Sequence, residues 1–142
     1  MNTKTQLKLA SLALIILITL SLSMMACGGA AATTLTRTTI NEKITAEAGK
    51  ALLAKFPGAI LLDVRTAAEN KESRIAGSIL ISVDELPNRL SELPKDPMKP
   101  IIVYCRSGNR SATAAAILVK AGFPVVYDMG GIIDWTYGVE KG

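Results

Sequence analysis

The chain has 142 residues, 49% of them hydrophobic, and a formal net charge of +4. This length is sufficient for one domain with its own core and too short for two. The charge is small, no block of Lys or Arg stands out, and one Trp, three Tyr and two Phe are too few for a base-stacking surface. We therefore expect no nucleic-acid partner.

Histidine is absent, and the only cysteines are Cys27 and Cys105. The lack of histidine excludes a Ser-His or Cys-His nucleophile–base pair and His-ligated zinc. Two cysteines are too few for a disulfide framework, and no Cys-x-x-Cys redox or metal site is present. We expect no metal and no cofactor, so a catalytic thiol has to ionise without an imidazole partner.

The N-terminal region is typical of a bacterial lipoprotein. Lys4 and Lys8 precede an apolar run that ends near Leu22, which is shorter than a spanning helix and has no charged stop-transfer flank. Ala26-Cys27 then resembles a lipobox, although Met24 stands where Leu is usual. The sequence predicts a signal peptide over 1–26, a lipid on Cys27 that attaches the protein to a membrane, and an extracytoplasmic location, periplasmic or on the cell surface.

Two alternatives for this region are an uncleaved signal anchor and a plain secretory peptide cut near Ala26. Residues 27–39 are small and rich in Thr, with Arg37 as the one charge, and this composition predicts a flexible tether. The folded domain is expected over 40–142.

The first elements of the domain follow from apolar patterns and turn residues. Thr45 suits the N-cap of a helix that ends near Lys55, with Gly49 inside it. The continuous apolar run 59–64 predicts a strand buried on both faces, and 79–81 predicts a second, shorter strand.

A short helix follows, because Leu86, Leu90 and Leu93 recur at helical spacing behind Asp84 and Glu85. Residues 101–104 predict a third strand, and 125–127 a fourth.

The segment 111–121 is apolar nearly all round, which predicts a buried helix, and 132–137 predicts a short final helix. Strands that alternate with helices indicate an α/β fold with a parallel central sheet and helices on both faces. In such folds the active site lies beyond the carboxyl ends of the strands.

Cys105 directly follows the third predicted strand and begins a polar loop. Gly108 allows the loop to curl so that successive backbone N–H groups form an anion-binding nest, and the next helix adds its positive end. Arg106 and Arg110 contribute two charges. These features favour a thiolate. The alternative, a buried structural thiol, does not explain the polar neighbours.

Four ordered motifs together resemble the rhodanese (thiosulfate sulfurtransferase) family over about 44–138. They are Leu62-Asp63-Val64-Arg65 with Glu69, then Ile75-Ala76-Gly77-Ser78-Ile79, then the segment from Val103 through Cys105 to Ser111, and finally Met129-Gly130-Gly131-Ile132-Ile133-Asp134-Trp135.

The resemblance implies a rhodanese-like fold and a sulfurtransferase. A small anionic donor such as thiosulfate would pass its outer sulfur to Cys105, and cyanide or a thiol would accept it. The residues implied to bind substrate are Arg106, Ser107, Gly108, Asn109 and Arg110. Asp63 and Arg65 would brace the loop as a charge-assisted pair. Gly130-Gly131 would form a turn and Trp135 a packed lid.

Three positions depart from the family pattern. Asn70 stands where an aromatic residue is frequent, Arg74 where His is frequent and Ser82 where Pro is frequent. We expect these departures to affect local stability and not the chemistry.

Two other functions remain open on the sequence. A phosphatase or arsenate reductase of the same fold uses a similar cysteine loop with one more residue, whereas four residues separate Cys105 from Arg110 here. This shorter loop suits a single sulfur, and no general acid follows it. The other alternative is a non-catalytic module that binds a partner or carries sulfur.

Overall fold

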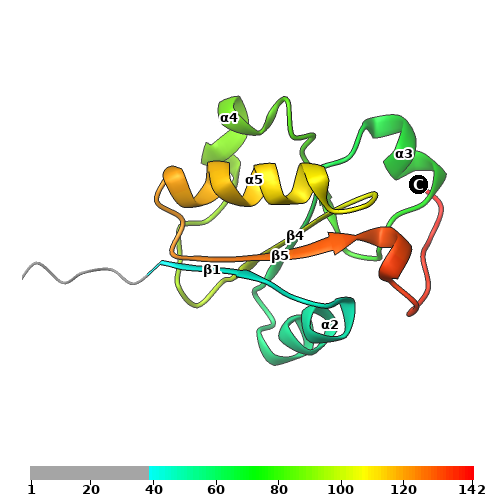
Figure 1. Ribbon diagram of the computed structural model, residues 1–142, viewed down its shortest axis with the longest axis horizontal. Coiled ribbons are helices and arrows are strands. Elements are labelled where there is room, and N and C mark those ends of the chain that lie inside the picture. The colour runs from blue at the N-terminus through cyan, green and yellow to red at the C-terminus, as the bar shows by residue number, and fades with distance from the viewer. Residues whose placement is uncertain (1–38) are drawn as a thin grey trace, which may run out of the picture. The chain divides into compact units, whose positions relative to one another are not determined.

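The computed structural model describes residues 39–142, and within them a five-stranded sheet has the order β1-β5-β4-β2-β3. Every strand pair is parallel. The strands are β1 (Ile40–Lys43), β2 (Ile60–Asp63), β3 (Ile79–Leu80), β4 (Ile101–Cys105) and β5 (Val125–Gly131). Because all strands run the same way, their carboxyl ends share one edge of the sheet (Figure 1).

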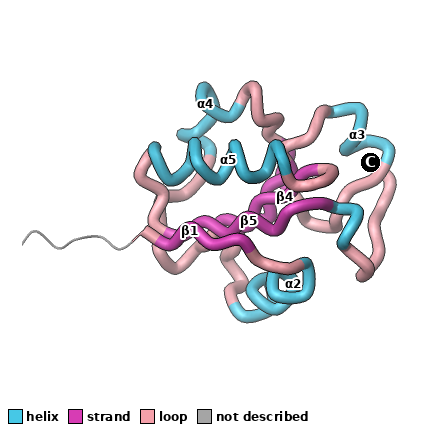
Figure 2. Tube along the Cα trace, in the orientation of Figure 1, coloured by secondary structure: helices cyan, strands magenta, loops and turns pink. Residues whose placement is uncertain are grey.

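Helices cover both faces of this sheet, as Figure 2 shows for α5 and α4 on one side and α2 on the other. The helices are α2 (Ala46–Lys55), α3 (Ala67–Glu72), α4 (Leu86–Arg89) and α5 (Asn109–Lys120), and the 3-10 turns are Leu90–Glu92 and Ile132–Asp134. The predicted α/β fold with a parallel sheet is confirmed. No helix among the described residues is long and apolar enough to cross a membrane.

The central strand β4 is buried along its whole length. Its residues alternate between two cores, since Ile101, Val103 and Cys105 pack on the α5 side and Ile102 and Tyr104 on the α2 side. This alternation is the period of two expected of a strand. Cys105 therefore ends β4 with its side chain on the face covered by α5.

Helix α2 begins as predicted, because the Thr45 hydroxyl accepts a hydrogen bond from the Ala48 backbone N–H at 3.2 Å. The structure also explains Gly49 within this helix. A Cβ at that position would collide with the Sδ atom of Met129 on β5. The glycine lets α2 approach the sheet closely.

The sequence did not predict β1 or α3. All four residues of β1 are exposed, so the strand has no apolar alternation. Helix α3 has only six residues and begins with a capping box in which Thr66 and Glu69 exchange hydrogen bonds.

Other predicted elements have different bounds or burial. The fourth strand extends to Gly131, and the final helix is the 3-10 turn Ile132–Asp134. Helix α5 is not buried all round: it buries Ser111, Ala114, Ala115 and Leu118, while its other alanines face outward. The prediction was wrong because alanine is small enough to remain on an exposed face.

The predicted signal peptide 1–26, Cys27 and all of the predicted tether 27–39 except Thr39 lie outside the described residues. Every described strand and helix lies between Ile40 and Asp134, within the domain predicted over 40–142.

Candidate active site

The loop that joins β4 to α5 encloses the sulfur of Cys105. The Gly108 backbone N–H donates to the Cys105 Sγ atom at 3.1 Å. Gly108 has a φ of +106°, which other residues rarely adopt, and this conformation turns the chain into α5. Cys105 itself is only 1% exposed, so its surroundings decide whether it ionises.

Two opposing effects act on the pKa of Cys105. Burial disfavours the thiolate and on its own would raise the pKa. Hydrogen bonds from the backbone N–H groups of Ser111, Gly108 and Ser107, together with the Ser111 hydroxyl, favour the thiolate and lower the pKa below its usual value. The backbone donors and one serine therefore provide most of the activation, and Arg110, which interacts with Cys105, adds to it.

Ser111 was not among the predicted site residues. It lies in the first turn of α5 and is fully buried. Its single hydroxyl proton can go to the Gly108 carbonyl, 2.9 Å away, or to the Cys105 sulfur, but not to both at once. A serine in the first turn of a helix is too common to have indicated this role from the sequence.

Arg110 is held in a bidentate ion pair with Glu69 of α3. Its two terminal nitrogens lie 2.7 and 2.8 Å from the Glu69 carboxylate oxygens. The Arg110 guanidinium is the main reason why the pKa of Glu69 falls to about 2. Glu69 in turn raises the pKa of Arg110, and the neighbouring Cys105 acts in the same direction.

The other predicted arginine has a different environment. Arg106 is exposed, and none of the ion pairs between described residues includes it. It lines a cavity of about 290 Å³ together with Glu69, Glu72 and Ile133. Arg106 is therefore the positive charge beside the loop that an incoming anion meets without displacing a carboxylate. Asn109 is also exposed at the start of α5.

Asp63 and Arg65 form a buried pair at the end of β2, 0% and 3% exposed. Arg65 donates to Asp63 through Nε and a terminal nitrogen, the latter at 2.6 Å, and the same nitrogen donates to the Ser73 carbonyl. Burial opposes the charge of Arg65, but the hydrogen bonds and charge of Asp63 outweigh it and raise the Arg65 pKa.

The Asp63 carboxylate also accepts from the Tyr104 hydroxyl at 2.9 Å and from the Asn70 amide at 3.0 Å. Asn70, which departs from the family pattern, is thus a buried partner of Asp63. Arg74 instead pairs with Glu140 near the chain's last residues. The Asp63 network fastens the segment that carries Glu69 to the sheet. It reaches the Cys105 loop through the Glu69–Arg110 pair and through Tyr104, which directly precedes Cys105.

The two glycines at the end of β5 allow the Cys105 loop to lie against that strand. A Cβ on Gly131 would come within 2.6 Å of the Arg106 carbonyl oxygen and 2.9 Å of the Ser107 Cα. Gly130 has a φ of +80°. Trp135, predicted as a lid, donates its Nε1–H to the Gly138 carbonyl and packs edge-on against Tyr137.

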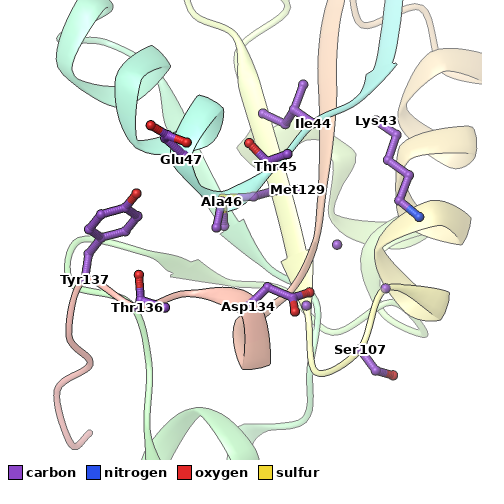
Figure 3. Close-up of a pocket in the computed structure, with 13 residues that line it drawn as sticks. Lys43, Ile44, Thr45, Ala46, Glu47, Ser107, Met129, Asp134, Thr136 and Tyr137 are labelled. Atoms are coloured by element: carbon purple, nitrogen blue, oxygen red, sulfur yellow. The ribbon is translucent and has the colours of Figure 1, made fainter.

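A second cavity of about 400 Å³ lies on the β1 side of the loop, beside Ser107 and Gly108. Figure 3 shows Lys43 and Asp134 on its wall, and Glu47 is also part of the lining. Two carboxylates accompany the one lysine there. The cavity beside Arg106 also has two carboxylates in its lining, but two arginines, Arg65 and Arg106, offset them, so a small dianion is better matched there.

Comparison with known proteins shows what the chain is related to. The family model described as "Rhodanese-like domain" matches residues 45–137. A sulfurtransferase of Allochromatium vinosum is 38% identical over 98 residues, which cover 68% of this chain and 89% of the relative. The thiosulfate sulfurtransferase GlpE of Pseudomonas savastanoi pv. phaseolicola is 35% identical over 102 residues, which cover 70% of this chain and 92% of the relative.

A solved structure supports the same assignment. The crystal structure of a rhodanese-like domain protein from Staphylococcus aureus superimposes with a TM-score of 0.63 and is 28% identical. The match covers 71% of this chain and 98% of that protein. These relatives support a sulfur-transfer role of the rhodanese kind, and the chain belongs to the family of rhodanese-like domains.

Proposed function

We propose that the protein moves a sulfane sulfur from a donor such as thiosulfate to a thiophilic acceptor through a persulfide on Cys105. The observation that carries this proposal is the enclosed sulfur. The Gly108 N–H lies 3.1 Å from Cys105 Sγ, and further donors from Ser107 and Ser111 lower the pKa of the thiol. A thiolate is the form that attacks sulfur.

The reaction has two balanced steps. The Cys105 thiolate attacks the outer sulfur of thiosulfate, the sulfur–sulfur bond of thiosulfate breaks, and sulfite leaves with the bonding electron pair. Cyanide, or a thiolate, then attacks the outer sulfur of the persulfide, and the Cys105 thiolate is released. The backbone donors of the loop stabilise negative charge on the bound sulfur as an oxyanion hole stabilises oxygen.

The two arginines have separate roles in this proposal. Arg106, exposed beside the 290 Å³ cavity, attracts the anionic donor. Arg110 is paired with Glu69, so its main effect is to hold the first turn of α5 against α3 while its charge still favours the thiolate. Ser107, Gly108 and Asn109 contribute the loop that surrounds the transferred sulfur.

Thiosulfate:cyanide transfer by the purified domain tests the proposed function. We expect thiocyanate to form from thiosulfate and cyanide, and aryl phosphates to be hydrolysed poorly or not at all. Aryl phosphate hydrolysis without thiocyanate would assign the loop to phosphoryl chemistry. Absence of both activities would favour a binding module.

We also propose that a lipid on Cys27 anchors the domain at the extracytoplasmic side of a bacterial membrane. The support is the short apolar run followed by Ala26-Cys27. Labelled palmitate supplied to bacteria that express the full chain should enter the protein, and Cys27→Ala should prevent this. Equal labelling of the two forms would contradict the proposal.

A further inference from the structure

Four of the described lysines lie at one edge of the sheet, where the strands begin. The register aligns the start of β2 with that of β4 and places the starts of β1 and β5 beside them. Lys55 ends α2, Lys120 ends α5, and Lys95 and Lys99 lie in the loop that leads into β4. All four are exposed. In Figure 1 this edge is on the left, and the arrowhead of β5 points away from it toward the candidate active site.

Contacts join these lysines into one surface, which we call the lysine edge (Lys55, Lys95, Lys99 and Lys120). Lys95 donates to the Ala121 carbonyl at 2.7 Å, directly after Lys120. The Lys99 side chain lies against Gly58, three residues after Lys55. The four lysines are spread over 66 positions of the sequence, so they form no basic block from which the surface could have been predicted.

The charge of the lysine edge is largely uncompensated. None of its four lysines takes part in an ion pair between described residues. The three loops at this edge contain one carboxylate, that of Asp96, which accepts a hydrogen bond from the Met98 N–H. Met98 is 69% exposed within the same loop. Four positive charges at one edge, with an exposed apolar side chain in one of its loops, match an anionic membrane surface.

We infer that the lysine edge binds anionic lipid headgroups and directs the active site away from the bilayer. The β1 strand begins at this edge, and the chain between Cys27 and Ile40 can span at most about 45 Å. An anchor on Cys27 would therefore keep the edge near the membrane. The Cys105 loop, at the opposite ends of the strands, then faces soluble donors and acceptors.

A nucleic acid is less well matched to this surface. A single strand binds partly by stacking its bases on aromatic side chains, and the nearby Phe56 and Phe123 are not exposed for such stacking. Binding to tRNA is therefore an outcome that the test has to separate from binding to lipid.

The test uses the fragment 36–142, which lacks Cys27 and cannot be lipidated there. The fragment contains the whole rhodanese-like match 45–137, and the Staphylococcus aureus protein is matched over 98% of its length, so a domain of this extent folds without further segments. The fragment is sedimented at low ionic strength with vesicles of phosphatidylglycerol and phosphatidylcholine in equal parts, and with pure phosphatidylcholine vesicles. We expect binding to the first only, and its loss as salt is raised.

Two triple variants with equal net charge distinguish the lysine edge from general attraction. Lys55, Lys99 and Lys120 changed to Gln should weaken binding to anionic vesicles on the order of 100-fold, since each lysine near such a surface contributes about a fivefold gain. Lys50, Lys71 and Lys141 changed to Gln should retain most of the binding. Sulfur transfer should be the same in both variants, which shows that both are folded.

Three results would overturn the inference: no binding to anionic vesicles, equal loss in the two triple variants, or tighter binding to tRNA than to vesicles through the same three lysines. The outcome does not depend on the lipidation of Cys27, because the fragment lacks that residue. It is equally independent of the proposed reaction, because vesicle binding is measured without sulfur donor or acceptor.

Discussion

Two buried acidic groups lie at the ends of neighbouring strands, Asp63 on β2 and Cys105 on β4, and the protein surrounds them in different ways. Side chains surround the Asp63 carboxylate, namely those of Arg65, Asn70 and Tyr104. Mainly backbone N–H groups surround the Cys105 sulfur, and Ser111 and Arg110 are the side chains that act on it.

The difference separates a structural group from a reactive one. Side-chain donors that pair fully with a carboxylate leave it no capacity for a substrate, and they tie three segments together. Backbone donors are fixed by the fold, carry no counter-charge and can stabilise whichever anion occupies the loop. The latter arrangement suits the proposed function, in which the Cys105 sulfur gains and loses a second sulfur atom.

The largest expected effect tests whether the Asp63 network stabilises the fold. Asp63→Asn leaves Arg65 buried without its counter-charge, so the free energy of unfolding should fall by about 3–5 kcal/mol in urea titrations. Glu140→Gln, which breaks the exposed pair with Arg74, should change it by no more than about 1 kcal/mol. A loss for Asp63→Asn as small as that for Glu140→Gln would show that the network is not a stabilising element.

The next largest effect tests the position of the Cys105 loop. Gly131→Ala places a Cβ against the Arg106 carbonyl and Ser107, so the loop has to move. A displacement of about 1 Å at a reacting centre lowers rates on the order of 100-fold, which steady-state assays of sulfur transfer would detect. Gly58→Ala is the control, because its Cβ meets only the flexible Lys99 side chain. Full activity in Gly131→Ala would show that the close contact between β5 and the Cys105 loop is not needed for sulfur transfer.

A smaller effect concerns the Ser111 hydroxyl, a side-chain donor beside the Cys105 sulfur. Ser111→Ala removes a hydroxyl that favours the thiolate, so the pKa of Cys105 should rise and less thiolate should exist at a given pH below it. Rates of Cys105 alkylation should fall about 3- to 10-fold on the acidic side, with the acid limb shifted to higher pH. Thr113→Ala, whose hydroxyl bonds only the Asn109 carbonyl, should leave the profile in place.

The smallest effect concerns the ion pair between Glu69 and Arg110, which connects the Asp63 network to the Cys105 loop. The pKa of Glu69 is lowered to about 2 in the folded state, so its pairing with Arg110 stabilises the fold above pH 4 to 5 and is lost as the pH falls toward 2. Glu69→Gln should therefore lower the free energy of unfolding by about 1 kcal/mol at pH 7. The two proteins should become equally stable near pH 2, and a difference that persists there would assign the effect to another contact.

Sequence patterns predicted the buried elements well and the exposed or short ones poorly. The apolar runs that became β2 and β4 and the Thr45 cap are strong local signals. β1 has no apolar pattern because all its residues are exposed. Gly130 and Gly131 were interpreted as a turn, whereas they end β5 where the Cys105 loop crosses closely.

The sequence was sufficient to predict the Cys105 loop, but not the side-chain contacts that connect this loop to α3. The spacing from Cys105 to α5 indicated a nest of backbone donors, and the Asp63-Val64-Arg65 segment indicated a pair. The contact between Glu69 and Arg110 joins residues 41 positions apart, so only the fold brings them together. The Thr66-x-x-Glu69 pattern could have revealed α3, because it is a capping box, although not its partner.

The central claim is that Cys105 carries the transferred sulfur. The fragment 36–142 contains no other cysteine, so incubation with thiosulfate followed by mass spectrometry gives a clear answer. The peptide that contains Cys105 should gain the mass of one sulfur atom, and cyanide should remove it and yield thiocyanate. Cys105→Ser should fold and show neither the gain nor turnover. Two results would contradict this assignment. One is thiocyanate production at the normal rate by Cys105→Ser, and the other is turnover by the unmodified sequence with no added sulfur on the Cys105 peptide.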